Sequence, residues 1–206
     1  MLPILENKIR YSRGLKRYIN KLRPLQGGEW DLKTDEIKFV KKQIRLQLMK
    51  FQDSKCAYCG LKLGETSADE IEHIAPKGGK ARPKYTMFTF TPYNLVLACR
   101  LCNGPTKKGT KDTITKWDIN YRNCEFNIFH PYFDNPDDHF EWIPNGYKVV
   151  IQHKTEKGKN SIKMFKLDNS AHLEARAKEV SYMLLRRMQE DKAEELIQNI
   201  LNYKGE

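Results

Sequence analysis

The sequence predicts an α+β protein in which helical segments flank a compact core of short strands and turns. Apolar residues recur at helical spacing in the first 51 residues and again after residue 168. The stretch between them instead carries two Cys-X-X-Cys pairs, many turn residues and short apolar runs. It also carries an Asn-Gly step at 145–146 between alternating apolar positions, a pattern typical of a β-hairpin.

The length of 206 residues is sufficient for one domain with a substantial apolar core. We expect three parts along the chain. Residues 1–51 form a basic helical region, residues 52–119 form the core that holds the cysteine pairs, and residues 120–206 form a strand-and-loop element followed by C-terminal helices. We expect this last part to pack as one domain with the core.

Two helices are expected in the N-terminal region. The first covers residues 13–23 and is ended by Pro24. The second follows Thr34, a suitable N-cap, and runs to about Phe51. Its buried stripe consists of Ile37, Val40, Ile44 and Leu48. Its opposite face is basic, and such a face is usually only solvated; it contains Lys38, Lys41, Lys42 and Arg45.

The sequence after residue 51 shows a different pattern, in which short strands and loops precede further helices. A short strand is expected at 69–74, followed by a loop over 75–92 in which basic residues alternate with Tyr85, Phe88 and Phe90. Such a loop suits contact with nucleic acid, and packing of the aromatic side chains beneath it explains the pattern equally well. Residues 121–167 predict short strands and turns, and residues 168–203 predict two helical segments that break near Asp191.

The charge of the chain is unevenly distributed. The formal net charge is +11, and the first 50 residues alone hold 13 basic and 5 acidic side chains. The C-terminal residues 168–206 hold 6 basic and 8 acidic side chains. This difference favours a polyanion such as nucleic acid on the N-terminal side, with a solvated lysine surface as the alternative.

The chain shows no sign of a membrane or secretory segment. No apolar run approaches the roughly 20 residues that cross a bilayer. The N-terminus lacks the apolar region of a secretory signal. We therefore expect a cytoplasmic protein without membrane partners.

Four of the five cysteines form two pairs, Cys56 with Cys59 and Cys99 with Cys102. In a chain without a secretion signal, this arrangement indicates a metal site rather than disulfides. Four thiolates leave no open coordination position, so we predict a closed, structural zinc site. Cys124 is left over, and we expect it to be a small buried apolar residue.

The segment between the cysteine pairs contains "EIEHIAP", with Glu72 followed by His73. Taken alone, His73 could be a zinc ligand, a buried structural histidine or a catalytic base. The four cysteines account for the zinc, and two amide residues accompany the motif. Asn94 begins the segment that leads to the second cysteine pair, and Asn103 directly follows Cys102.

Together, "CAYCG", "IEHIAPKG" and "NLVLACRLCNGPTKKG" resemble the HNH nucleases of the ββα-metal type, in the subgroup stapled by two Cys-X-X-Cys pairs. The resemblance covers about residues 52–111. It implies a strand–strand–helix core in which His73 is the general base and Asn94 positions it. It also implies that Glu72 and Asn103 bind one Mg²⁺ or Mn²⁺, for which oxygen ligands are suited. Asparagine in place of the last histidine is a common family variant.

The same resemblance implies that the substrate is DNA, although contacts to the phosphate backbone would suit RNA as well. The candidate nucleic-acid contacts are Lys77, Arg100, Lys107 and Lys108. For the lysines after Cys102, surface charge is an equally good explanation, and a helix is expected to begin near them. If one site per chain makes a double-strand cut, the active form is a homodimer.

A weaker resemblance covers the whole chain. Compact bacterial nucleases of the retron-associated and Septu (PtuB-like) type share the core motif, an element similar to "HPYFDNPDDHFEW" at 130–142, and a helical C-terminus. This resemblance implies anti-phage defence beside an ATPase partner, which the C-terminal helices would bind. We expect His130 and His139 of the 130–142 element to be ordinary residues, with a second metal site among them and the aspartates of this loop as the alternative.

Two other functions fit the same sequence. The protein could be a zinc-stapled nucleic-acid-binding module without catalysis, or a nuclease subunit that is active only inside a complex. A binding module has no use for Glu72, His73 and Asn103 in this order, so these three residues discriminate it from an enzyme.

Overall fold

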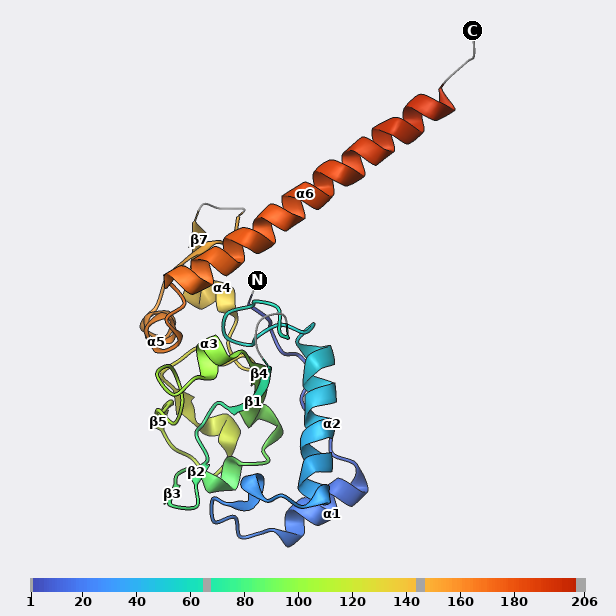
Figure 1. Ribbon diagram of the computed structural model, residues 1–206. Helices are drawn as coiled ribbons and strands as arrows, with labels where there is room; N and C mark the ends of the chain where they lie inside the picture. The colour runs from blue at the N-terminus through green and yellow to red at the C-terminus, as the bar shows by residue number, and fades with distance from the viewer. Residues whose placement is uncertain (1, 65–67, 144–146, 203–206) are drawn as a thin grey trace.

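The structure is a computed structural model that describes residues 2–64, 68–143 and 147–202. It confirms the α+β class: helices of very different length surround four small two-stranded antiparallel sheets (Figure 1). One hydrophobic cluster contains buried side chains from Leu2 to Leu167, so all three parts of the chain up to that residue contribute to it.

The two expected N-terminal helices are confirmed. Helix α1 (Arg13–Lys21) begins after Ser12, whose hydroxyl accepts a hydrogen bond from the backbone N–H of Leu15. Helix α2 (Asp35–Phe51) begins after Thr34, and its first turn carries the two acidic side chains that favour a helix N-terminus. Its predicted stripe of Ile37, Val40, Ile44 and Leu48 is completely buried.

The centre of the molecule is the antiparallel pair of strands β1 (Glu70–His73) and β4 (Leu95–Ala98). Helix α2 packs against β4. The side chain of Gln52, at the end of α2, accepts a hydrogen bond from the N–H of Leu97 and donates one to its carbonyl oxygen. This contact joins the N-terminal region to the strand that leads into the second cysteine pair.

The connection between β1 and β4 is folded onto the core. It contains β2 (Gly78–Gly79), β3 (Arg82–Pro83) and two 3-10 helices, η2 (Thr86–Phe88) and η3 (Pro92–Asn94). Phe88 and Phe90 are buried, so these aromatic side chains of the loop pack in the core and do not face a ligand. A third 3-10 helix, η1 (Glu29–Asp31), lies between α1 and α2 in the sequence.

Short elements follow the strand pair. Helix α3 (Arg100–Asn103) is a single turn that contacts β1, and the chain order strand, strand, helix is the one the resemblance implies. The helix ends before Lys107, where a helix had been expected to begin. The elements that come next are β5 (Ile114–Lys116), η4 (Tyr121–Asn123), β6 (Glu125–Phe126) and α4 (Pro136–His139).

The predicted hairpin corresponds to the antiparallel strands β7 (Phe140–Ile143) and β8 (Val150–His153). Its Asn-Gly step at 145–146 lies outside the described residues. Helix α5 (Glu156–Phe165) was not expected. Its Thr155 N-cap was a visible signal, but the few apolar residues that it buries do not stand out in a lysine-rich stretch.

Helix α6 (Ser170–Leu201) is continuous through Asp191, so the predicted break is wrong. One exposed aspartate costs a helix well under 1 kcal/mol, and the residues on both sides are good helix formers. The helix packs on the core only at its start and then projects away from the molecule (Figure 1). Within the described part of the chain, no helix combines the length and apolar character needed to span a membrane.

Candidate functional site

The four paired cysteines converge on one point of the fold. Cys56 and Cys59 lie at the tight turn after α2, while Cys99 is the N-cap of α3 and Cys102 lies within its single turn. Their sulfur atoms all lie within 4.8 Å of one another, and all four side chains are buried. The backbone N–H of Cys99 also points at the sulfur of Cys56, at 3.4 Å, as is suitable for a thiolate acceptor.

The cluster fits a tetrahedral zinc ion. A Zn–S bond of about 2.3 Å places two sulfur ligands roughly 3.8 Å apart, and the Sγ atoms of Cys59 and Cys99 are separated by 3.7 Å. A positive group also lies close by. Arg176 of α6 is 3% exposed, and its Nε and Nη2 atoms are buried without a hydrogen-bond partner in the described structure.

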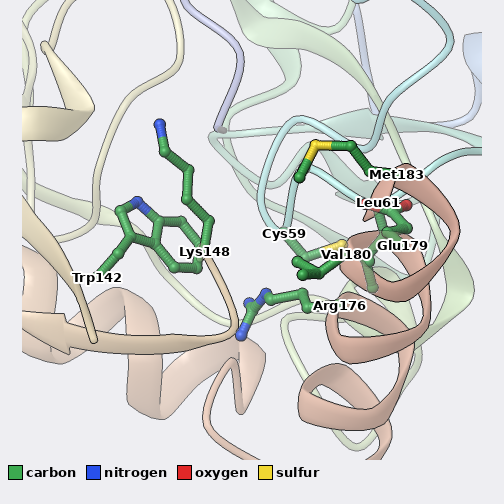
Figure 2. Close-up of a pocket in the computed structure, with 9 residues that line it drawn as sticks. Cys59, Leu61, Trp142, Lys148, Arg176, Glu179, Val180 and Met183 are labelled. Atoms are coloured by element: carbon green, nitrogen blue, oxygen red, sulfur yellow. The ribbon is translucent and has the colours of Figure 1, made fainter. Parts of the chain in front are cut away.

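Arg176 suits the charge of such a site. Four thiolates with one Zn²⁺ carry a net charge of −2. Burial lowers the pKa of Arg176, whereas the negative charges of Cys59 and Cys102 act in the opposite direction and favour the charged guanidinium. Figure 2 shows Arg176 extending from α6 past Cys59 toward Trp142, whose ring lies 5.2 Å from the guanidinium carbon. His172 of α6 lies beside Cys102, with 3.6 Å between Nε2 and Sγ.

Strands β1 and β4 bring His73 and Asn94 together. His73 is the last residue of β1 and lies opposite Leu95, the first residue of β4. The Nε2 atom of His73 lies 3.0 Å from the carbonyl oxygen of Thr89. A carbonyl can only accept, so Nε2 carries the proton and Nδ1 is left as the basic nitrogen. Among the described residues, no hydrogen bond to Nδ1 of His73 is present.

The environment of His73 keeps its imidazole neutral. Its side chain is buried, and burial, reinforced by the charge of Lys77, lowers the pKa of His73 to about 3. The ring of Trp30 from η1 meets it edge-on, with 4.6 Å between ring centroids. His73 is only 6% exposed, and Trp30 is one of the side chains that pack against it.

Asn94 is fully buried and uses its whole amide. Its Oδ1 accepts from the N–H of Ala75 at 2.6 Å. Its Nδ2 donates to the carbonyl oxygens of Ala75 and Phe88, at 3.1 and 3.0 Å. Asn94 therefore ties the chain just after His73 to the chain just before Thr89, as a positioning residue would.

Glu72 points to the other face of β1, because successive side chains of a strand alternate. It is buried and forms an ion pair with Lys108, which also donates a hydrogen bond of 2.8 Å to the carbonyl oxygen of His73. Burial raises the pKa of Glu72, and Lys108 counteracts that rise. Lys108 is 1% exposed, so in this structure it contacts protein and is not accessible to a phosphate, contrary to the sequence-based expectation.

The predicted metal ligands Glu72 and Asn103 have other partners here. Asn103 donates a hydrogen bond from Nδ2 to Glu70, at 2.8 Å, and Glu72 is held by Lys108. Glu70 is also 3.8 Å from the exposed guanidinium of Arg100. The structure thus brings Asn103 to Glu70, two residues before the carboxylate that the sequence motif suggests.

The remaining candidate contacts differ in position. Lys77 lies near His73 and forms an ion pair of 2.9 Å with Asp31. Lys107 is half-buried in the turn after α3. The sequence did not identify Lys41 of α2 as part of the site. Its ammonium lies 5.0 Å from the centre of the Trp30 ring, and its charge contributes to the lowered pKa of His73. Its basic helix face was visible in the sequence, but its place beside the histidine was not.

Comparisons with known proteins add one family resemblance. No protein-family model matches the chain. Two curated proteins, both named Septu protein PtuB, are similar to the chain in sequence. The one from Bacillus mycoides (strain KBAB4) is 28% identical over 155 residues, which is 69% of this chain and 52% of that protein. The one from Bacillus thuringiensis is 30% identical over 129 residues, covering 62% and 42%.

The chain is a distant homologue of these Septu proteins. It spans about half the length of the curated relatives it matches. The level of identity supports a shared origin, and the chemistry of this chain has to be argued from its own residues.

Proposed function

We propose that the protein is a metal-dependent endonuclease of the HNH type that hydrolyses phosphodiester bonds of DNA. The observation that carries this proposal is the state of His73: one ring nitrogen is fixed by Thr89, and the other is basic and unpaired, beside Lys77 and Lys41. A neutral imidazole with a free Nδ1 is the state that a general base needs, and the lysines are arranged to attract a phosphate. The negative charge of that phosphate would raise the pKa of His73 from its low value in the free protein.

In this proposal the residues of the chain divide the work. His73 accepts the proton of the attacking water at Nδ1, while Asn94 and Thr89 hold its ring in place. Lys77 and Lys41 attract the substrate phosphate, with Arg100 and Lys107 as further contacts to the backbone. A bound Mg²⁺ or Mn²⁺ would neutralise charge on the phosphate.

The proposed ligands of that ion are Glu72 and Asn103. For Glu72 this requires that the ion takes the place of Lys108, which neutralises the carboxylate in the present structure. Glu70 is the carboxylate already beside Asn103. We expect Glu72→Gln to raise the Mn²⁺ concentration needed for cleavage about 10- to 100-fold. A larger effect of Glu70→Gln would instead assign the ion to Glu70 and Asn103.

We also propose a role in anti-phage defence, supported by the similarity to proteins named Septu protein PtuB. Under this proposal the nuclease works beside an ATPase. The projecting part of α6 is the proposed contact surface, because it exposes large apolar side chains, including Tyr182, Leu185, Met188 and Leu196. Truncation after residue 181 keeps His172 and Arg176 in place, and unchanged co-purification with the ATPase would refute this contact.

One observation favours activity only inside a complex, the alternative that the sequence leaves open. Trp30 packs edge-on against the His73 ring, and His73 is only 6% exposed, so we infer that movement of Trp30 widens the access of a phosphate to this ring. Incubation with plasmid and Mg²⁺ or Mn²⁺ tests this. Cleavage only by the Trp30→Ala variant or after addition of the partner would support it, whereas full cleavage by the isolated protein would refute it.

A further inference from the structure

A chain of buried polar side chains runs from the downstream loop to the candidate active site. His130, which begins the 130–142 element, lies 3.0 Å from the hydroxyl of Tyr121 through its Nε2 atom. That hydroxyl donates a hydrogen bond of 3.0 Å to Oδ1 of Asn94. All three side chains are at most 4% exposed.

The direction of this chain is determined by one backbone group. The N–H of Tyr132 can only donate, and it points at Nδ1 of His130 at 3.3 Å. Nδ1 is therefore the acceptor nitrogen, and Nε2 carries the proton that is donated to Tyr121. The hydroxyl of Tyr121 then has its own proton available for Asn94, and burial raises the pKa of Tyr121, which keeps that proton in place.

Asn94 connects this chain of hydrogen bonds to the two segments that surround the His73 imidazole. Its Oδ1, the atom that Tyr121 binds, also accepts from the N–H of Ala75, two residues after His73, at 2.6 Å. Its backbone carbonyl oxygen accepts from the N–H of Ile74 at 2.9 Å. Its Nδ2 donates to Phe88, the residue before the Thr89 carbonyl that fixes the imidazole. Tyr121 and His130 thereby support the amide that holds the two ends of the His73 environment at a fixed separation.

We propose that Tyr121 and His130 are positioning residues that act through Asn94 to hold the imidazole of His73 in its Nε2–H, Nδ1-basic form. The role in cleavage rests on the proposed nuclease function, whereas the effect on the His73 ring does not. The downstream element is then part of the catalytic apparatus and not only a covering of the core. A buried network of this kind holds its geometry only when every member has a partner.

The test compares four single-residue variants of the 206-residue chain, each loaded with zinc. Tyr121→Phe and His130→Leu break the chain of hydrogen bonds. His130→Gln keeps an N–H donor at the position of Nε2. Tyr132→Phe is the matched control, because it too removes a tyrosine hydroxyl that donates a hydrogen bond. That hydroxyl binds the backbone carbonyl oxygen of Leu95, at 2.8 Å, so its loss leaves the relay complete.

The first measurement is the rate of plasmid cleavage over a range of plasmid concentrations, which gives kcat and KM. We expect kcat to fall about 5- to 10-fold in Tyr121→Phe and in His130→Leu, the loss of one buried hydrogen bond, with KM unchanged. We expect His130→Gln and Tyr132→Phe to stay within about twofold of the original chain. Equal kcat values for all four variants and the original chain would overturn the proposal.

The second measurement is the state of each imidazole in ¹⁵N-labelled protein, read from long-range ¹H–¹⁵N correlation spectra. We expect His73 to lose its pure Nε2–H form in Tyr121→Phe and His130→Leu and to keep it in Tyr132→Phe. A merely structural effect on stability would change the two tyrosine variants alike. If no variant or parent cleaves DNA even with the partner present, but the His73 ring responds as expected, the relay stands and the nuclease proposal fails.

Discussion

The two faces of strand β1 carry adjacent residues with opposite surroundings. On one face, His73 has a neutral ring, a basic nitrogen without a hydrogen-bond partner among the described residues, and two nearby lysines, of which Lys77 is paired with Asp31. On the other face, Glu72 is buried and already paired with Lys108, on the side where Tyr58 and the cysteine cluster lie. Under the proposed function, the first face carries the chemistry, whereas the second contributes to stability and would bind any metal that replaces the lysine.

Removal of the cysteine cluster should produce the largest effect, because it acts on the stabilising face. Structural zinc contributes on the order of 10 kcal/mol in small domains, which is comparable to the whole stability of a typical protein. We expect Cys102→Ser or a strong chelator to abolish the cooperative thermal transition followed by circular dichroism. Cys124→Ser is the control, since Cys124 is buried outside the cluster. A chelated protein that unfolds as before would contradict the zinc assignment.

Breaking the Glu72–Lys108 pair should have the next largest effect. Lys108→Met leaves a buried carboxylate without its partner, and we expect the free energy of unfolding to fall by about 3–5 kcal/mol. The double variant with Glu72→Gln should recover part of this loss because no charge remains buried. Denaturant unfolding measures both values. If Lys108→Met alone is neutral, Glu72 does not depend on the lysine and the contrast between the two faces disappears.

Much of the fold could be read from the sequence because the signals are local. The caps at Ser12 and Thr34, the stripe of α2 and the spacing of the cysteine pairs each depend on neighbours within a few residues. The sequence did not predict helix α5, because that helix depends on tertiary packing. It predicted a break in α6 at Asp191, but a single aspartate is too weak a signal to end a helix.

The candidate site was predictable as a set of residue types but not as a set of partners. The motif identified His73, Asn94 and Asn103, yet it did not indicate that Asn103 meets Glu70. Lys41 and Trp30 lie more than thirty positions before His73, and Tyr121 with His130 lie well beyond it. Contacts between such distant segments follow from the three-dimensional packing, which no local pattern reports.

Acid should destabilise the protein through its buried neutral histidines. Burial, followed by the charge of Lys157, lowers the pKa of His130 to about 3. In the unfolded chain this histidine binds a proton near pH 6.5, whereas in the folded chain it stays neutral until about pH 3. Its contribution to stability is therefore complete above pH 6.5 and falls as the pH is lowered toward 3. We expect a loss of about 1.4 kcal/mol per pH unit for each such histidine. His130→Gln should reduce the slope by one proton, and an unchanged slope would contradict a neutral His130.

The lysines near His73 should have the smallest effect. Replacement of Lys41 or Lys77 by alanine removes one phosphate contact and should weaken DNA binding about equally for all sequences. The slope of log affinity against log salt concentration should decrease by about 0.9. Lys192→Ala, on the projecting part of α6, is the control and should leave the slope unchanged. A reduced slope only in the control variant would move the DNA-binding surface to α6.

The central claim is that His73 is the catalytic base. Purified protein, together with its partner if the isolated chain is inactive, is incubated with plasmid and Mg²⁺ or Mn²⁺, with and without His73→Ala. We expect the variant to bind DNA normally and to cleave it about 10²- to 10⁴-fold more slowly, as expected for loss of a general base. Cleavage at the original rate by His73→Ala would contradict the account.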